Sequence, residues 1–93
     1  MNFSDKASIP EHVLARHVGD ETVILDLASG TYFGLDAVGA RIWQLVSDGM
    51  SLAEIRDVML AEYDVSLADI ERDIAALAAN LQSHGLIAGR PRL

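Results

Sequence analysis

Histidine and carboxylate side chains, which often carry out chemistry in proteins, are present but are not spaced as a catalytic or metal site. His12 and His17 lie on opposite faces of an expected strand, and His84 stands at an expected helix end, where the helix dipole favours a partly positive imidazole. No two histidines have the helical spacing of metal ligands, cysteine is absent, and no serine stands in a G-x-S-x-G context. We therefore expect a protein that is not an enzyme and that needs neither a metal nor a cofactor.

Carboxylates are numerous, with fourteen acidic residues against seven basic ones and a formal net charge of −7. Asp69, Glu71 and Asp73 are close together in the longest expected helix, and Asp64 lies just before it. The simpler interpretation is a solvated helix face, with the first-turn acid favoured by the helix dipole. The functional interpretation is that one or two of these groups receive a basic residue of a bound peptide. The net charge disfavours nucleic acid as a partner.

Three short strands would position these residues. Their β-branched and aromatic composition and the turn residues between them predict strands at Val13–Val18, Thr22–Leu27 and Thr31–Leu35. Such strands form an antiparallel meander, and no later strand in the sequence covers the last one. An open edge of this kind carries unpaired N–H and C=O groups and can accept another strand.

Three helices follow, each introduced by a capping residue. Asp36 caps the first, Ser51 and Glu54 form a capping box before the second, and Ser66 caps the third; the expected bounds are Ala37–Val46, from Ser51 onward, and Ser66–Ser83. The third helix has an apolar stripe at three- and four-residue spacing: Leu67, Ile70, Ile74, Leu77 and Leu81. Strands followed by helices predict an α+β fold, winged helix-turn-helix-like, with a three-stranded antiparallel sheet followed by three helices.

The 93 residues suffice for one domain. We expect a flexible N-terminal segment over residues 1–12, a folded domain over 13–88 and a C-terminal tail over 89–93. The start of the chain is polar and aperiodic, and Pro10 prevents a regular helix there. Without a secretion signal, a run of about 20 apolar residues or any cysteine, the chain is expected to be cytoplasmic.

Several short motifs occur in a characteristic order. The pattern G-x-Y-F-x-L-x-x-x-G-x-x-I-W runs from Gly30 to Trp43, S-L-A-E-I starts the second helix, and L-x-x-H-G-L-I lies near the end. Over about Val13 to Ile87 the sequence thereby resembles the PqqD family, the leader-peptide recognition elements of ribosomally synthesised and post-translationally modified peptides. It is most similar to the stand-alone members of lasso-peptide pathways.

The resemblance implies that a leader peptide is held as an added strand between the third strand and the third helix. Carried over by position, the implied peptide-binding residues are Thr31, Tyr32, Phe33, Gly34, Leu35, Ile70, Asp73, Ile74 and Leu77. The implied partners are a precursor leader peptide and a processing enzyme, either a leader peptidase or a radical modifying enzyme, with no nucleic acid and no membrane. Tyr32 and Phe33 point to opposite faces, and the sequence leaves open which of them faces the groove.

Two other functions remain open. The helix pair joined near Tyr63 is typical of helix-turn-helix DNA-binding regulators, although the acidic third helix would repel phosphate. A structural or oligomerisation subunit could instead pair the same open edge with its own copy. Some members of the resembled family form homodimers, so a homodimer is compatible with peptide capture as well.

Overall fold

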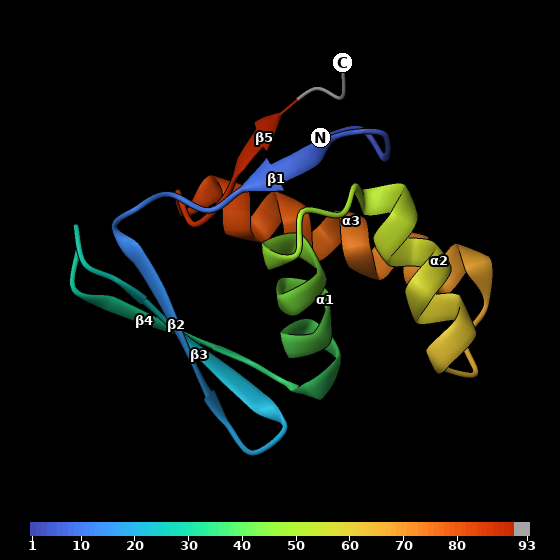
Figure 1. The fold of residues 1–93 in the computed structure, drawn as a ribbon, viewed down its shortest axis with the longest axis horizontal. Helices are drawn as coiled ribbons and strands as arrows, with labels where there is room; N and C mark the ends of the chain where they lie inside the picture. The colour runs from blue at the N-terminus through green and yellow to red at the C-terminus, as the bar shows by residue number, and fades with distance from the viewer. Residues whose placement is uncertain (91–93) are drawn as a thin grey trace.

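The computed structural model of the protein describes residues 1–90, which form two small sheets and three helices (Figure 1). The elements in chain order are β1 (Lys6–Ser8), β2 (Val13–Val18), β3 (Glu21–Asp26), β4 (Thr31–Leu35), α1 (Ala37–Ser47), α2 (Leu52–Glu62), α3 (Leu67–Ser83) and β5 (Ala88–Arg90). The expected α+β fold, with a three-stranded antiparallel sheet followed by three helices, is confirmed. No helix among residues 1–90 is long and apolar enough to cross a bilayer.

The larger sheet has the order β2-β3-β4, with both neighbouring pairs antiparallel. A two-residue turn joins β2 to β3, and its Gly19 has a φ of 61°, as the first central position of a type II′ hairpin requires. The inner face of β3 carries Thr22, Ile24 and Asp26, all buried, while the alternate residues face outward. The sequence predicts that side chains of β3 alternate between two faces, and the packing of the helices determines which of these faces is buried.

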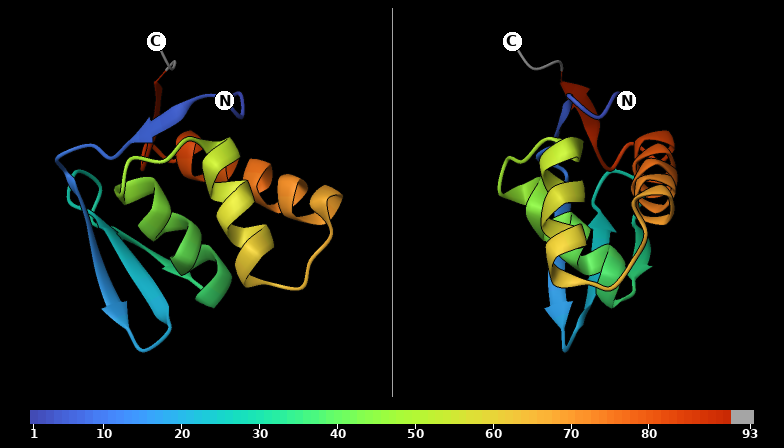
Figure 2. Two further views of the ribbon diagram at one scale, coloured as in Figure 1. Left: turned by 45° about the vertical axis from the view of Figure 1, so that its right-hand side comes forward. Right: turned by 90° about the vertical axis from the view of Figure 1, so that its right-hand side faces the viewer.

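The helices begin where the capping residues predict. The Asp36 carboxylate accepts a hydrogen bond from the Gly39 N–H at 2.9 Å, and Ser51 and Glu54 form the complete capping box. The α1 helix packs on β3, α2 packs on α1, and α3 packs on α2 (Figure 2). Between these layers lies one core, which contains these buried side chains: Ile24, Leu35, Trp43, Leu45, Ile55, Met59, Ile70, Ile74, Leu81 and Leu86.

The two ends of the chain form the smaller sheet, in which β1 pairs antiparallel with β5 (Figure 1). Here the structure differs from the expectation of a frayed start, because Ala7 is buried and lies opposite Gly89. The first N–H groups of α2 also need acceptors: Leu52 donates to the Asp5 carbonyl at 3.1 Å and Ala53 to the Phe3 carbonyl at 2.8 Å. The expected C-terminal tail begins inside β5, and its residues 91–93 lie outside the described part of the chain.

Candidate functional site

The outer edge of β4 is the first feature of the candidate site (Figure 1). The hydrogen-bond register of the sheet follows from one contact, the Leu27 N–H donating to the His12 carbonyl at 2.8 Å. Hydrogen-bonded pairs recur every second residue in an antiparallel ladder, so the Leu25 main-chain groups point to β2 and those of Ile24 point to β4. Phe33, which lies opposite Ile24, therefore directs its own N–H and C=O toward β3.

It follows that Tyr32 and Gly34 direct their N–H and C=O groups away from the sheet. Within residues 1–90 no hydrogen bond of the protein reaches these groups, and β4 has no second neighbouring strand. The edge thus offers two donors and two acceptors on alternate residues, which is the pattern another strand needs. Phe33 and Leu35 offer only side chains at this edge, because their main-chain groups face β3, and the Thr31 N–H donates to the Ser29 hydroxyl at 3.3 Å.

A groove adjoins this edge on the inner side of the sheet. It has a volume of about 430 Å³ and is lined by the end of β4, one flank of α1 and the middle of α3: Gly34, Leu35, Asp36, Val38, Gly39, Ile42, Asp73, Leu77 and Asn80. Four of the residues implied by the family resemblance, Gly34, Leu35, Asp73 and Leu77, therefore meet around one hollow. The prediction from the sequence missed the other five lining residues, although Asn80 follows Asp73 and Leu77 at helical spacing on the same face of α3: Asp36, Val38, Gly39, Ile42 and Asn80.

Ile70 and Ile74 do not line the groove. Their side chains are only 2% and 0% exposed and belong to the core beneath α3. The expected apolar stripe of α3 is thus divided: Ile70, Ile74 and Leu81 face the core, whereas Leu77 lines the groove beside Asp73 and Leu67 is 52% exposed. The two isoleucines position this groove wall without being accessible to a guest.

Tyr32 and Phe33 lie on opposite faces of β4, as their adjacent positions predict. Tyr32 is 68% exposed on the outer face, opposite Leu25, whereas Phe33 is half-buried on the inner face. The Phe33 ring meets the His84 ring edge-on at a centroid distance of 4.7 Å. His84 Nδ1 lies 2.8 Å from the Asn80 carbonyl oxygen, which can only accept a hydrogen bond, so Nδ1 is the ring nitrogen that donates. Phe33 is therefore the aromatic residue on the α3 side.

Two carboxylates, those of Asp36 and Asp73, line the groove. Asp36 contributes one carboxylate oxygen to the helix cap, and the side chain of Asp73 is 59% exposed with Arg72 Nε at 3.8 Å. Arg72 also contacts Asp69 at 3.1 Å, so this one base is shared between two acids. The resulting field favours a guest that is neutral or basic near the groove.

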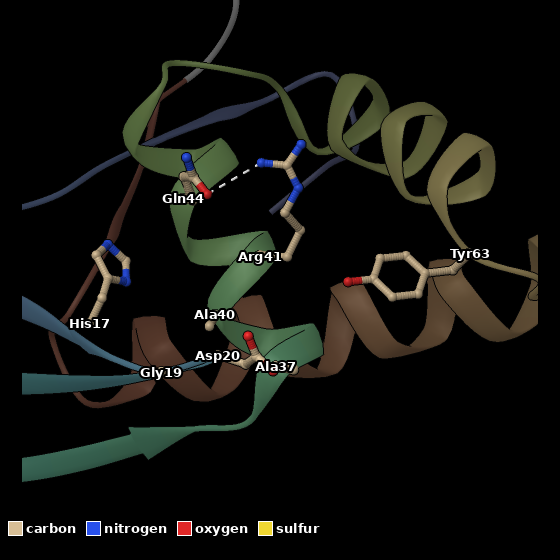
Figure 3. A pocket seen from close by; sticks show the side chains of 8 residues that line it. All are labelled: His17, Gly19, Asp20, Ala37, Ala40, Arg41, Gln44 and Tyr63. Atoms are coloured by element: carbon tan, nitrogen blue, oxygen red, sulfur yellow. Dashed lines mark hydrogen bonds between the residues drawn. The ribbon is translucent and has the colours of Figure 1, made fainter.

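A second hollow, of about 550 Å³, lies on the opposite flank of α1, between the β2–β3 turn and Tyr63 (Figure 3). Its one guanidinium is satisfied, because Arg41 forms a bidentate pair with Glu62 at 2.9 and 2.6 Å and also reaches Gln44 at 3.3 Å. The hydrogen bond from Arg41 holds the pKa of Glu62 below its ordinary value. His17 contacts the buried Thr22 hydroxyl at 2.9 Å, which anchors one side of its ring. Across residues 1–90 no group of three metal-ligating side chains is found.

Residues 21–87 match the family model described as coenzyme PQQ synthesis protein D (PqqD). A solved structure of TbiB1 in complex with the TbiA(beta) leader peptide is similar, with 43% identity, a TM-score of 0.84 and a match over 90% of this chain and 98% of that one. A lasso peptide synthetase B1 complexed with its leader peptide is 32% identical with a TM-score of 0.82, over 89% of this chain and 98% of that one. No curated protein sequence matches.

Proposed function

The chain belongs to the PqqD family, and we propose that it is a non-catalytic protein that captures the leader segment of a ribosomally synthesised precursor peptide. Capture occurs by strand addition to β4, and the bound leader is presented to a separate processing enzyme. The observation that carries this proposal is the coincidence of two unpaired main-chain positions, Tyr32 and Gly34, with a groove beside the same strand.

Backbone pairing and side-chain contacts have different roles in this mechanism. Two donors and two acceptors on β4 allow up to four main-chain hydrogen bonds, each worth about 0.5–1.5 kcal/mol net. Such bonds fix the guest's register but recognise no sequence. Recognition must come from side chains, which alternate between the two faces of an added strand.

On the inner face, guest residues opposite Phe33 and Leu35 point toward α3. There they meet Leu77 and Val38, with Asp73 at the rim. An apolar guest side chain fits the floor of this groove, and a basic one fits its rim. A leader segment with alternating apolar residues and at least one base therefore suits the site.

We assign the protein to a lasso-type pathway, with a leader peptidase as the processing enzyme. The support is that both similar structures hold leader peptides and that one of them is a lasso peptide synthetase B1. Binding then raises the effective concentration of the leader at the enzyme, because tethering makes their encounter intramolecular.

Amide hydrogen exchange tests the proposal, with peptides selected by the protein from a random display library and then synthesised. In the free protein the Tyr32 and Gly34 amides should exchange quickly, while the Phe33 amide is already protected by Ile24. A selected peptide should protect Tyr32 and Gly34 specifically.

Three results would contradict the proposal. The first is a selection that yields no binding peptide, and the second is a bound peptide that leaves both amides unprotected. The third is protection that appears without peptide and grows with protein concentration, which would indicate that the edge pairs with a second copy of the chain.

A further inference from the structure

Gly34 is a glycine that the free protein does not require. Its φ is not positive, and a Cβ built on it would meet no atom within 4 Å. Strands disfavour glycine, because it loses more conformational entropy on folding and offers no side chain to pack. Glycine in a strand can also mark a position that another chain approaches closely.

The missing side chain opens the outer face of the sheet toward its edge. Directly opposite residues share a face, so Gly34 stands in a row with Val23, and Tyr32 stands in the next row with Leu25 and Leu14. Tyr32 is 68% and Leu14 52% exposed, and they border a shallow, mainly apolar hollow of about 480 Å³ that also includes Val23 and Leu25. Val23, which lies directly opposite Gly34 on the same face, lines this hollow, whereas Gly34 itself borders the groove on the inner face.

A strand added to β4 would place one residue directly opposite Gly34. The pair would be hydrogen-bonded, since the Gly34 main-chain groups face the edge, and the guest side chain would stand on the outer face. Neighbouring strands lie about 4.8 Å apart, so the guest residue and Val23 are about 10 Å apart with only glycine between them. A long side chain can lie across this gap, whereas a small one leaves it empty.

We propose that the leader segment carries a large apolar or aromatic side chain opposite Gly34, and that this side chain lies across the glycine against Val23 and Tyr32. The inference rests on the proposed function and adds a second specificity pocket, on the face of the sheet opposite the α3 groove. The occupant is the guest strand itself, because a guest residue paired with Gly34 directs its side chain onto this face, in the row of Val23. Apolar surface that is exposed in the free protein is thereby covered on binding.

Substituting Gly34 tests this pocket. Gly34→Val fills the space that the guest side chain would occupy, and the free protein should fold at least as stably, because valine favours strands and a Cβ at this position meets no atom within 4 Å. For peptides selected by the wild-type protein, fluorescence anisotropy should show an affinity loss of about 10- to 100-fold, as expected for losing one buried apolar side chain. Gly34→Ala should show a smaller loss. Glu21→Val, an exposed strand position that lines neither this hollow nor the α3 groove, should show none.

The peptide provides the complementary test. Alanine substitution along a selected peptide should identify one outward position whose loss matches that of Gly34→Val. The affinity of Gly34→Val for that substituted peptide should be only slightly lower than the affinity measured with either change alone. Unchanged affinity of Gly34→Val, in a protein whose Tyr32 and Gly34 amides are still protected by peptide, would overturn the pocket and leave strand capture standing. Failure of every peptide to protect those amides would instead overturn the proposed function itself.

Discussion

Two side chains three residues apart on α3 separate structure from recognition. Ile74 is fully buried in the core, whereas Leu77 is partly buried and lines the groove. Leu77→Asp should therefore weaken peptide binding by about tenfold or more, because it exchanges an apolar contact for a charge at the groove floor. Because Leu77 also packs against the core, the melting temperature of this variant should fall, but by less than that of a variant that places the same charge at the fully buried Ile74. Anisotropy titration and calorimetry measure the two quantities on the same sample.

Ile74→Ala is the matched variant on the same helix. It should lower the free energy of unfolding by about 2–5 kcal/mol, because it opens a cavity in the core. The fraction that remains folded should bind peptide with nearly wild-type affinity. If Ile74→Ala abolished binding while Leu77→Asp left it intact, the peptide would bind deeper under α3 than the groove described above.

The sequence showed the apolar stripe of α3 but not its direction. Ile70, Ile74 and Leu77 recur at the same helical spacing, and only the placement of α1 and α2 decides which of them are covered. The family resemblance pointed to β4 and α3, the strand and helix that border the groove. It could not distinguish residues that contact a guest from those that support them, because neighbouring helix positions are apolar for both reasons.

Among the elements, β4 has N–H groups that pair with β3 and N–H groups that point away from the sheet, and proline substitutions distinguish the two. Phe33→Pro removes an N–H that pairs with Ile24 and should lower the melting temperature markedly. Tyr32→Pro removes an N–H that points away from the sheet, so the protein should remain folded and lose peptide affinity. Tyr32→Ala retains that N–H and controls for the lost ring. Greater destabilisation by Tyr32→Pro than by Phe33→Pro would show that the inferred register is shifted by one residue.

The turn between β3 and β4 depends on the Asp26 carboxylate. It accepts hydrogen bonds from the Ser29 hydroxyl at 2.9 Å and the Ala28 N–H at 3.0 Å, and His12 lies 3.8 Å away. The Ser29 hydrogen bond, followed by the Ala28 N–H and the charge of His12, lowers the pKa of Asp26 below its ordinary value of 3.8, against the opposing effect of burial. The folded state therefore binds fewer protons than the unfolded chain between these two pKa values.

This difference gives stability a defined pH dependence. The contribution of Asp26 is fully present above about pH 4 and is lost as the pH falls through the lower folded pKa. Asp26→Asn should be less stable than the wild type at pH 7, and the gap should narrow below pH 4. Urea unfolding over a pH series measures this. A constant gap at every pH would mean that the carboxylate charge contributes nothing to the turn.

Helix starts were the most predictable elements, because each depends on local chemistry. Ser51 with Glu54, and Ser66 with the Asp69 N–H, form the caps that their spacing indicates. The strands β1 and β5 could not be found in this way. Each has three residues, too few for a periodic signal, and their pairing joins Lys6 to Arg90 across nearly the whole chain.

At the scale of the whole molecule, the N-terminal segment stabilises the fold through its contacts with α2 and β5. Its Phe3 and Asp5 carbonyls accept the first N–H groups of α2, and Ala7 is buried against β5. Deleting residues 1–9 should lower the free energy of unfolding by about 2 kcal/mol or more, because two helix N–H groups lose partners and buried surface is exposed. A chain that begins at Phe3 retains these contacts and should lose much less. Equal stability of both chains would show that β1 contributes little.

The charge of the whole molecule separates peptide capture from DNA regulation, the main rival suggested by the helix arrangement. A helix that enters a DNA groove needs arginine or lysine side chains that are free to contact phosphate. On α3, Arg72 is instead shared between Asp69 and Asp73. With a net charge of −7, the protein should not shift a random-sequence duplex even at low salt. Changing Asp69, Glu71 and Asp73 to lysine should create weak, salt-sensitive binding and show that the assay detects it. A salt-dependent shift by the wild-type protein would favour the regulator, since nucleic-acid affinity arises mainly from released counterions.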